Sequence, residues 1–179
     1  MRDVIQKVLV TQEQIVKRSA ELGAQITKEY TEVNETPLLV ALLKGSVPFL
    51  SELIKHIDME IQFDFMDVSS YQGTESIGDI RIDKDLDCSV KGLSILLVED
   101  IIDTGRTLKE VTTLLKNKGA KDVKVVSLLD KPDRRVVDIE ADYVGFQIPN
   151  EFVVGFGLDY DQLFRNLPFI GVLKPEVYK

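Results

Sequence analysis

Three carboxylates and a run of small polar residues stand together in one short stretch of this chain. In order they are Glu99, Asp100, Asp103, Thr104, Gly105, Arg106 and Thr107. Neighbouring carboxylates accept hydrogen bonds from vicinal hydroxyls or hold a hard divalent cation. Free amides and hydroxyls at the start of a helix bind phosphate, because the helix dipole favours negative charge there. A ligand with hydroxyls at one end and phosphate at the other, such as a sugar phosphate, matches both groups.

A strand and a helix must hold these residues in place. The run from Ile95 to Val98 is continuously apolar, which is typical of a strand covered on both faces in a parallel sheet. Leu108, Val111 and Leu115 follow at helical spacing. Gly119 then predicts the end of that helix. Because α/β proteins bind ligands at the carboxyl edge of the sheet, the pattern predicts a binding site between the strand and the helix.

The rest of the chain alternates helices with apolar strands. Thr11 to Gln14 has the pattern of a capping box and predicts a helix to about Tyr30. Further apolar runs predict strands at 38–43, 61–65, 123–129, 143–146 and 152–154, and a helix at 47–56. From Ser69 to Gly92 charges and glycines replace this periodicity, which predicts a loose hairpin that acts as a lid. The alternation predicts an α/β fold with a doubly wound, mostly parallel twisted sheet flanked by helices.

Composition predicts a single globular domain over residues 1–179, with a core at about 30–160, a small hood made by both chain ends, and the lid at about 69–92. Hydrophobic residues make up 44% and charged residues 29%, as in ordered soluble proteins. The formal net charge of −8 argues against a nucleic-acid partner. Without a membrane-length apolar run or a signal-peptide core, we expect a cytoplasmic protein with no membrane partner. An acidic protein that binds a polyphosphate should also need a cation.

The segment from Val98 to Leu108 resembles the phosphoribosyl pyrophosphate (PRPP) motif of type I phosphoribosyltransferases, in the form found in the hypoxanthine-guanine phosphoribosyltransferase family. Other segments follow in that family's order and approximate spacing: Leu43-Lys44-Gly45, Ser69-Ser70-Tyr71, Lys131, Phe152 to Gly155, Leu158 to Tyr160 and Phe164-Arg165. The resemblance covers nearly the whole chain. It implies the type I phosphoribosyltransferase fold and a purine salvage reaction, in which PRPP and hypoxanthine or guanine give IMP or GMP and pyrophosphate.

The resemblance implies a role for each matched residue at the PRPP end. Asp103 would be the catalytic acid or base that faces N7 of the purine. Glu99 and Asp100 would approach the ribose hydroxyls, directly or through Mg²⁺, and Asp159 would lie near a second Mg²⁺. The remaining residues that would bind phosphate or pyrophosphate are Lys44, Gly45, Thr104, Gly105, Arg106, Thr107 and Arg165. The peptide between Leu43 and Lys44 would be cis.

At the base end, the resemblance implies five contacts, made by Ile101, Lys131, Phe152, Val153 and Asp159. Lys131 would donate to the 6-oxo oxygen. Phe152 and Ile101 would cover the two faces of the purine, and the Val153 backbone would read its edge. Asp159 would lie near the exocyclic group.

The lid and the assembly also follow from the resemblance. Ser70 and Tyr71 would close over PRPP during the reaction. Because the family usually forms dimers or tetramers, we expect a homodimer or a homotetramer.

Each residue also has a purely structural interpretation. Asp103 at the start of a helix is typical of an N-cap, and Glu99 and Asp100 fit a solvated acidic corner at a strand end. Lys44 with Gly45 fits a strand terminus with a turn, and Arg165 fits a surface ion pair. Aromatic residues such as Phe152 are commonly part of the core.

Two other functions share part of the pattern. A regulator that retains the PRPP fold as a sensor should lack Lys131 with Phe152 and should carry an added domain or a basic face. A phosphorylated receiver domain would use Glu99 and Asp100 as its acidic pair, near the start of the domain. Here about a hundred residues with strands of their own precede that pair.

Overall fold

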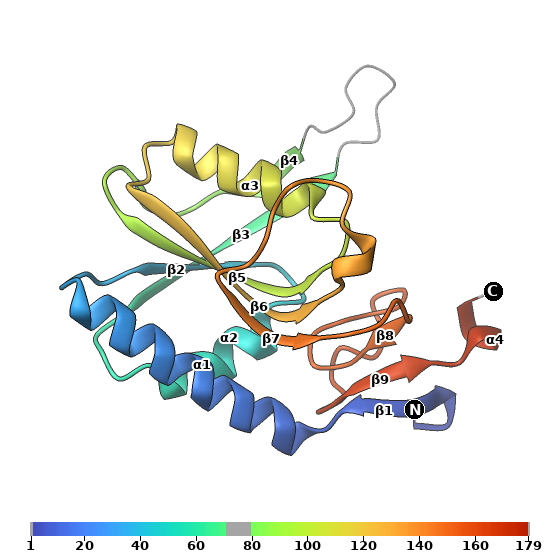
Figure 1. Ribbon diagram of the computed structural model, residues 1–179. Helices are drawn as coiled ribbons and strands as arrows, with labels where there is room; N and C mark the ends of the chain where they lie inside the picture. The colour runs from blue at the N-terminus through green and yellow to red at the C-terminus, as the bar shows by residue number, and fades with distance from the viewer. Residues whose placement is uncertain (1, 71–79, 179) are drawn as a thin grey trace.

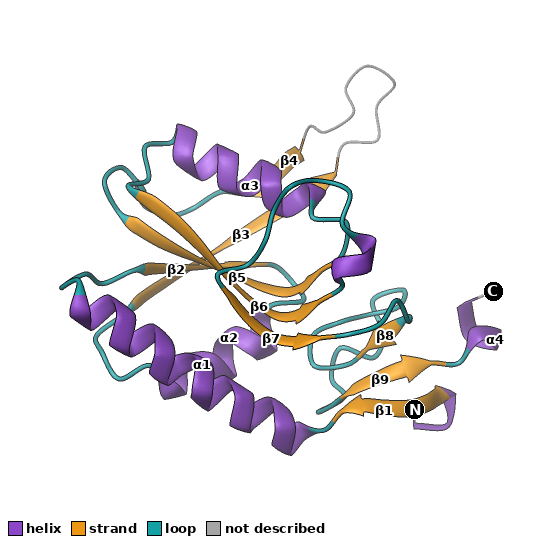
Figure 2. Cartoon of the chain, in the orientation of Figure 1, coloured by secondary structure: helices purple, strands orange, loops and turns teal. Residues whose placement is uncertain are grey.

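The computed structural model describes residues 2–70 and 80–178 (Figures 1 and 2). In chain order the elements are η1 (Arg2–Val4), β1 (Ile5–Val10), α1 (Gln12–Glu32), β2 (Leu38–Leu42), α2 (Val47–Leu53), η2 (Ile54–His56), β3 (Gln62–Ser70), β4 (Ile80–Lys84), β5 (Ser94–Ile102), α3 (Arg106–Asn117), β6 (Asp122–Asp130), η3 (Pro132–Arg134), β7 (Tyr143–Gln147), β8 (Val153–Val154), β9 (Ile170–Leu173) and α4 (Pro175–Tyr178). The three elements labelled η are single turns of 3-10 helix.

The central sheet has six strands in the order β4-β3-β2-β5-β6-β7. All neighbours pair in parallel except β3 with β4, which pair antiparallel. Helices α1 and α2 cover one face, and α3 covers the other (Figure 1). This arrangement confirms the predicted α/β fold with a mostly parallel sheet flanked by helices.

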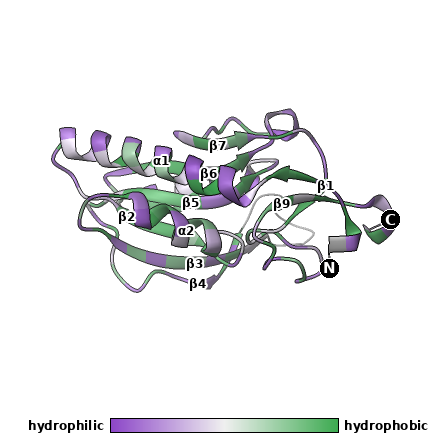
Figure 3. Cartoon of the chain, turned by 90° about the horizontal axis from the view of Figure 1, so that it is seen from below, coloured by the Kyte–Doolittle hydropathy of each residue, from purple (hydrophilic) through white to green (hydrophobic). Residues whose placement is uncertain are grey.

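Strand β5 lies at the centre of the sheet because its apolar side chains are buried on both faces. Leu96 and Val98 pack into the core with α1 and α2, whereas Ile95 and Leu97 pack into a second core with α3. All four side chains are inaccessible to solvent. The hydrophobic colour of the central strands in Figure 3 follows from this double coverage.

Helix α1 begins at the predicted capping box. The Gln14 amide donates to Thr11 Oγ1 at 3.2 Å, and the Thr11 amide donates to Gln14 Oε1 at 2.8 Å. The helix packs against α2 and β7, so it belongs with the central layers. No helix in the described ranges combines the length and the apolar character that a membrane span requires.

Both chain ends form a hood beside the central sheet. Its three-stranded antiparallel sheet has the order β1-β9-β8. The hood lies beyond the carboxyl ends of the parallel strands, next to the edge where the ligand site was predicted (Figure 1). Its own small core contains Val154, Leu167, Phe169 and Leu173.

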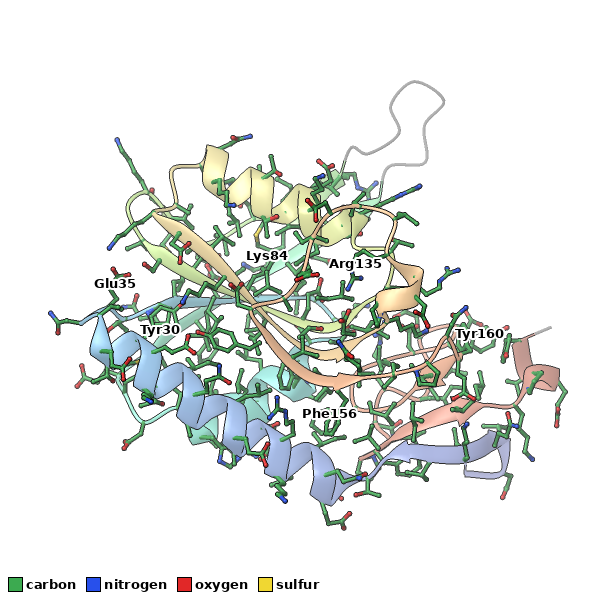
Figure 4. All side chains as sticks on the ribbon, viewed as in Figure 1. Tyr30, Glu35, Lys84, Arg135, Phe156 and Tyr160 are labelled. Carbon is green, nitrogen blue, oxygen red and sulfur yellow. The ribbon has the colours of Figure 1, made fainter. Side chains whose placement is uncertain are left out.

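The predicted lid hairpin is described only at its base. Strand β3 runs to Ser70, further than the expected 61–65, and pairs with β4 through Ser70 and Ile80. Tyr71 and the rest of the segment to residue 79 lie outside the described residues. Lys84, labelled in Figure 4, ties the base of the hairpin by donating to the Phe65 carbonyl at 3.1 Å and by pairing with Asp64.

Candidate active site

The turn between β5 and α3 differs from the sequence expectation in a way that changes the interpretation of Asp103. Strand β5 continues through the acidic pair to Ile102, and the N-cap of α3 is Gly105. Gly105 has φ +81°, and a Cβ atom there would lie 2.7 Å from Ile139 Cγ2, so the position requires glycine. Asp103 therefore does not cap the helix, and the structural interpretation of this carboxylate is wrong.

The first turn of α3 offers donors for an anion. Within the described ranges, the amides of Gly105 and Thr107 donate no hydrogen bond to the protein. They face a cavity of about 190 Å³ at the end of β5. Its lining residues are Glu99, Asp100, Ile101, Ile102, Asp103, Thr104, Gly105, Thr107 and Leu108. A helix start with free amides beside such a cavity can bind phosphate.

The acidic pair beside this cavity has raised pKa values. Burial raises the pKa of Glu99 well above its usual value, and the nearby Asp100 raises it further. Burial also raises the pKa of Asp100 to about 6, although the Ile101 amide, which donates to its carboxylate at 2.7 Å, and Arg165 both oppose the rise. Two carboxylates held in this way are suited to a cation or to hydroxyl donors.

The predicted metal residues do not form one site by themselves. In the part of the chain that the structure describes, no group of three or more His, Cys, Asp or Glu side chains could hold a metal ion. Glu99, Asp100 and Asp159 therefore do not make a joint site of protein ligands alone. The donor set still fits Mg²⁺, because this ion is commonly held by one or two carboxylates together with substrate oxygens.

Two glycines allow the segments around the site to meet. The Leu43–Lys44 peptide is cis, as predicted. A Cβ atom at Gly45 would lie 1.6 Å from Asp100 Oδ2, and one at Gly157 would lie 1.9 Å from the Gly45 carbonyl oxygen. The segment after β2, the end of β5 and the loop after β8 therefore converge where only glycine fits.

Arg165 is held at the edge of the site by the loop that follows β8. Its guanidinium pairs with Asp159 at 3.0 Å and donates to the Gly157 carbonyl at 2.7 Å. The Gly157 amide in turn donates to the Arg165 carbonyl at 2.9 Å. Arg165 does form an ion pair, but with another predicted site residue, so its charge stays near Asp100, whose pKa it lowers.

Lys131 is hydrogen-bonded to two segments that carry other predicted base-binding residues. Its amide donates to the Ile102 carbonyl at 2.9 Å, next to Ile101. Lys131 Nζ donates to the Glu151 carbonyl at 2.7 Å, next to Phe152, and burial lowers the pKa of this lysine. Val153 is buried in the hood, whereas the Phe152 ring keeps 38% of its surface exposed.

Two arginines at the site were missed by the sequence analysis. Arg134 Nε pairs with Asp103 Oδ1 at 3.0 Å. The Arg135 guanidinium donates to the Asp103 carbonyl and pairs with Asp130 at the end of β6. Figure 4 labels Arg135 on the segment that joins β6 to β7. Two adjacent arginines shortly after Lys131 could have suggested a role in the site. Their position in the sequence, however, does not specify a partner about thirty residues earlier.

Comparisons with known proteins agree with this geometry. A model of the family described as phosphoribosyl transferase domain matches residues 6–161. The chain belongs to the phosphoribosyltransferase family. A hypoxanthine-guanine phosphoribosyltransferase from Lactococcus lactis is 61% identical over 97% of this chain and 94% of its own length. The corresponding protein from Streptococcus thermophilus is 57% identical over 97% and 96%.

A solved structure is also similar. The crystal structure of a hypoxanthine phosphoribosyltransferase from Staphylococcus aureus superposes with a TM-score of 0.93 at 53% identity, and the match covers 100% of this chain and 97% of the other. This phosphoribosyltransferase therefore has one candidate active site in the described residues. The site is surrounded by the end of β5, the start of α3, the segment after β2 and the hood.

Proposed function

We propose that this phosphoribosyltransferase is a purine salvage enzyme that transfers the 5-phosphoribosyl group from PRPP to hypoxanthine or guanine. The observation that carries the proposal is the connection between the two halves of the site. Lys131, which would read the base, is hydrogen-bonded to Ile102, the last residue of β5, and Ile102 is followed directly by Asp103, which would move the proton. The same hydrogen bond therefore positions the residue for proton transfer and the residue for base recognition relative to each other.

The reaction would be an in-line displacement at the anomeric carbon of PRPP. The bond from this carbon to the purine nitrogen forms while the bond to pyrophosphate breaks, through a transition state of oxocarbenium character. Negative charge develops on the departing pyrophosphate, and the Arg165 guanidinium and the amide of the cis Leu43–Lys44 peptide would stabilise it. Preorganised donors of this kind usually supply the largest part of such an acceleration. The free amides of Gly105 and Thr107 would hold the phosphate at the other end of the sugar.

Asp103 would take the proton from purine N7 as the new bond forms. General base catalysis of this kind contributes about two to four powers of ten. Since Gly105 provides the N-cap of α3, the Asp103 carboxylate is not needed for capping. Its ion pair with Arg134 is 43% exposed on the Asp103 side, so a substrate can reach this carboxylate.

We propose Mg²⁺ as the required metal. Glu99 and Asp100 would hold the ion, and it would supply positive charge that offsets the charge of PRPP and of the acidic pair. Asp159 would lie near a second Mg²⁺. The raised pKa values of Glu99 and Asp100 support this proposal, because burial disfavours the charged form of both carboxylates and a bound cation would favour it.

A sensor that has lost catalysis is the main alternative within the family. It is disfavoured because Lys131 and Phe152, which such a sensor should lack, are both present. Purified protein should be assayed with PRPP, Mg²⁺ and each of hypoxanthine, guanine, xanthine and adenine. Release of pyrophosphate with the 6-oxopurines supports the proposal, and its absence with all four bases would refute it.

Lys131→Ala should change the choice of base. A lysine donates hydrogen bonds and does not accept them, so it favours a 6-oxo group over the 6-amino group of adenine. The unmodified enzyme should therefore use hypoxanthine and guanine well and adenine scarcely at all. The variant should lose much of this efficiency, and its discrimination against adenine should weaken by about 1–3 kcal/mol.

The measurement for Lys131 is kcat/KM with hypoxanthine and with adenine for both proteins. Lys7→Ala is a suitable control, because Lys7 pairs with the Glu151 side chain at the surface while Lys131 contacts the Glu151 carbonyl. An unchanged ratio in the Lys131 variant would show that the base pocket has been assigned to the wrong residue.

We also propose that the protein acts in the cytoplasm.

We propose that it assembles as a homodimer or a homotetramer. Phe63 supports an assembly, because its side chain is 49% exposed on β3 although it packs edge-on against Phe65. Large exposed aromatic groups are common at subunit interfaces. Light scattering of the purified protein, with Phe63→Glu as the interface variant, would test the assembly.

A further inference from the structure

The ring of Phe152 is supported by two other aromatic rings of the hood. Tyr178 stacks on it with a centroid separation of 4.7 Å and an interplanar angle of 20°. Tyr160 meets it edge-on at 5.7 Å and 85°. Because Tyr178 covers one face by stacking while 38% of Phe152 stays exposed, the ring keeps surface that a ligand can reach. Figure 4 labels Tyr160 in the hood at the carboxyl side of the sheet.

Tyr178 is attached to the same framework as Phe152. The Leu173 amide of β9 donates to the Phe152 carbonyl at 2.9 Å, and β9 leads directly into α4, which carries Tyr178. The Lys174 amide donates to the Val4 carbonyl at 2.9 Å, which ties the start of α4 to the other chain end. Tyr178 also packs against the small core of the hood. The two stacked rings are therefore held in place by β9, by the other chain end and by the core of the hood.

We infer that Tyr178 is a positioning residue for the purine, which acts by holding the Phe152 ring from behind. This inference rests on the proposed function, in which the exposed surface of Phe152 stacks on the base. A ring that is already fixed loses little conformational freedom when the base binds, so more of the stacking interaction appears as affinity. Without Tyr178, the Phe152 ring would have to be ordered by the base itself.

The inference predicts an effect on the base rather than on PRPP. Tyr178→Ala should raise KM for hypoxanthine by about three- to tenfold at saturating PRPP, the range that corresponds to one aromatic pair. KM for PRPP should stay within about twofold, because none of the residues assigned to PRPP lies on α4. Tyr178→Phe should restore the base KM, since the ring and not the hydroxyl makes the contact.

The substitutions need controls for general damage to the hood. Tyr178→Leu keeps an apolar, though shorter, side chain without a flat ring, so it should raise the base KM while the melting temperature falls less than in Tyr178→Ala. Glu176→Ala changes an exposed residue of the same short helix and should leave both KM values unchanged. Calorimetric titration of a non-reacting base analogue with the PRPP-loaded enzyme would check the KM values as affinities.

The outcomes separate this inference from the proposed function. If the unmodified protein does not turn over any purine, the proposed function fails. If it is active but the Ala and Leu variants keep the same base KM, the proposed function stands and Tyr178 has no positioning role. A lower base KM in these variants would also overturn the inference, because Tyr178 would then compete for the surface that the base uses.

Discussion

Removal of divalent cations is expected to reduce turnover to background. The ligand site has Glu99 and Asp100 at the end of β5, and the chain as a whole carries a formal charge of −8. PRPP adds several negative charges to the same place. At about 4 Å, two like charges repel by about 4 kcal/mol in surroundings typical of a protein surface, so PRPP should not bind productively without a cation.

The experiment is an initial-rate assay with EDTA, followed by titration with Mg²⁺. A second measurement is the melting temperature with PRPP present. PRPP should raise it only when Mg²⁺ is added, since a ligand stabilises a protein only through binding to the folded state. EDTA by itself should not change the melting temperature, because the described residues contain no preformed metal cluster. Full activity in EDTA would contradict the proposed role of the metal.

Asp103→Asn is expected to lower kcat by about two powers of ten or more, with KM for PRPP nearly unchanged. Asparagine preserves the shape of the side chain but cannot accept the purine proton. The protein should remain folded, because Gly105 and not Asp103 caps α3. The ion pair with Arg134 is also lost, but its side chains are 46% and 43% exposed, and such pairs contribute little to stability.

Arg134→Gln is the matched control for this substitution. It removes the same ion pair but leaves the Asp103 carboxylate in place. Its kcat should stay within a few-fold of the unmodified enzyme. If Asp103→Asn and Arg134→Gln lowered kcat equally, the loss would come from the broken ion pair, and Asp103 would not be the base. The melting temperatures of both variants would establish that they are folded.

The local structure around the site could be predicted from the sequence, because it depends on neighbours along the chain. The capping box at Thr11, the apolar strand from Ile95 to Val98 and the stop at Gly119 all act within a few residues, and each is present in the structure. Alternating strands and helices then leave few topologies other than a parallel sheet with helices on both faces. The resemblance to the PRPP motif added the cis peptide after β2.

The contacts that organise the site were decided by the tertiary structure. The sequence pattern allowed Asp103 as the N-cap, but the N-cap is Gly105, where the left-handed backbone and the close approach of Ile139 both require glycine. Arg135 reaches Asp103 from 32 residues away, and Tyr178 meets Phe152 across the hood. Spacing along the chain specifies which residues share a face of one element. Which faces meet depends on how the hood and the loops pack on the sheet, since each buried surface is made by segments that lie far apart in the sequence.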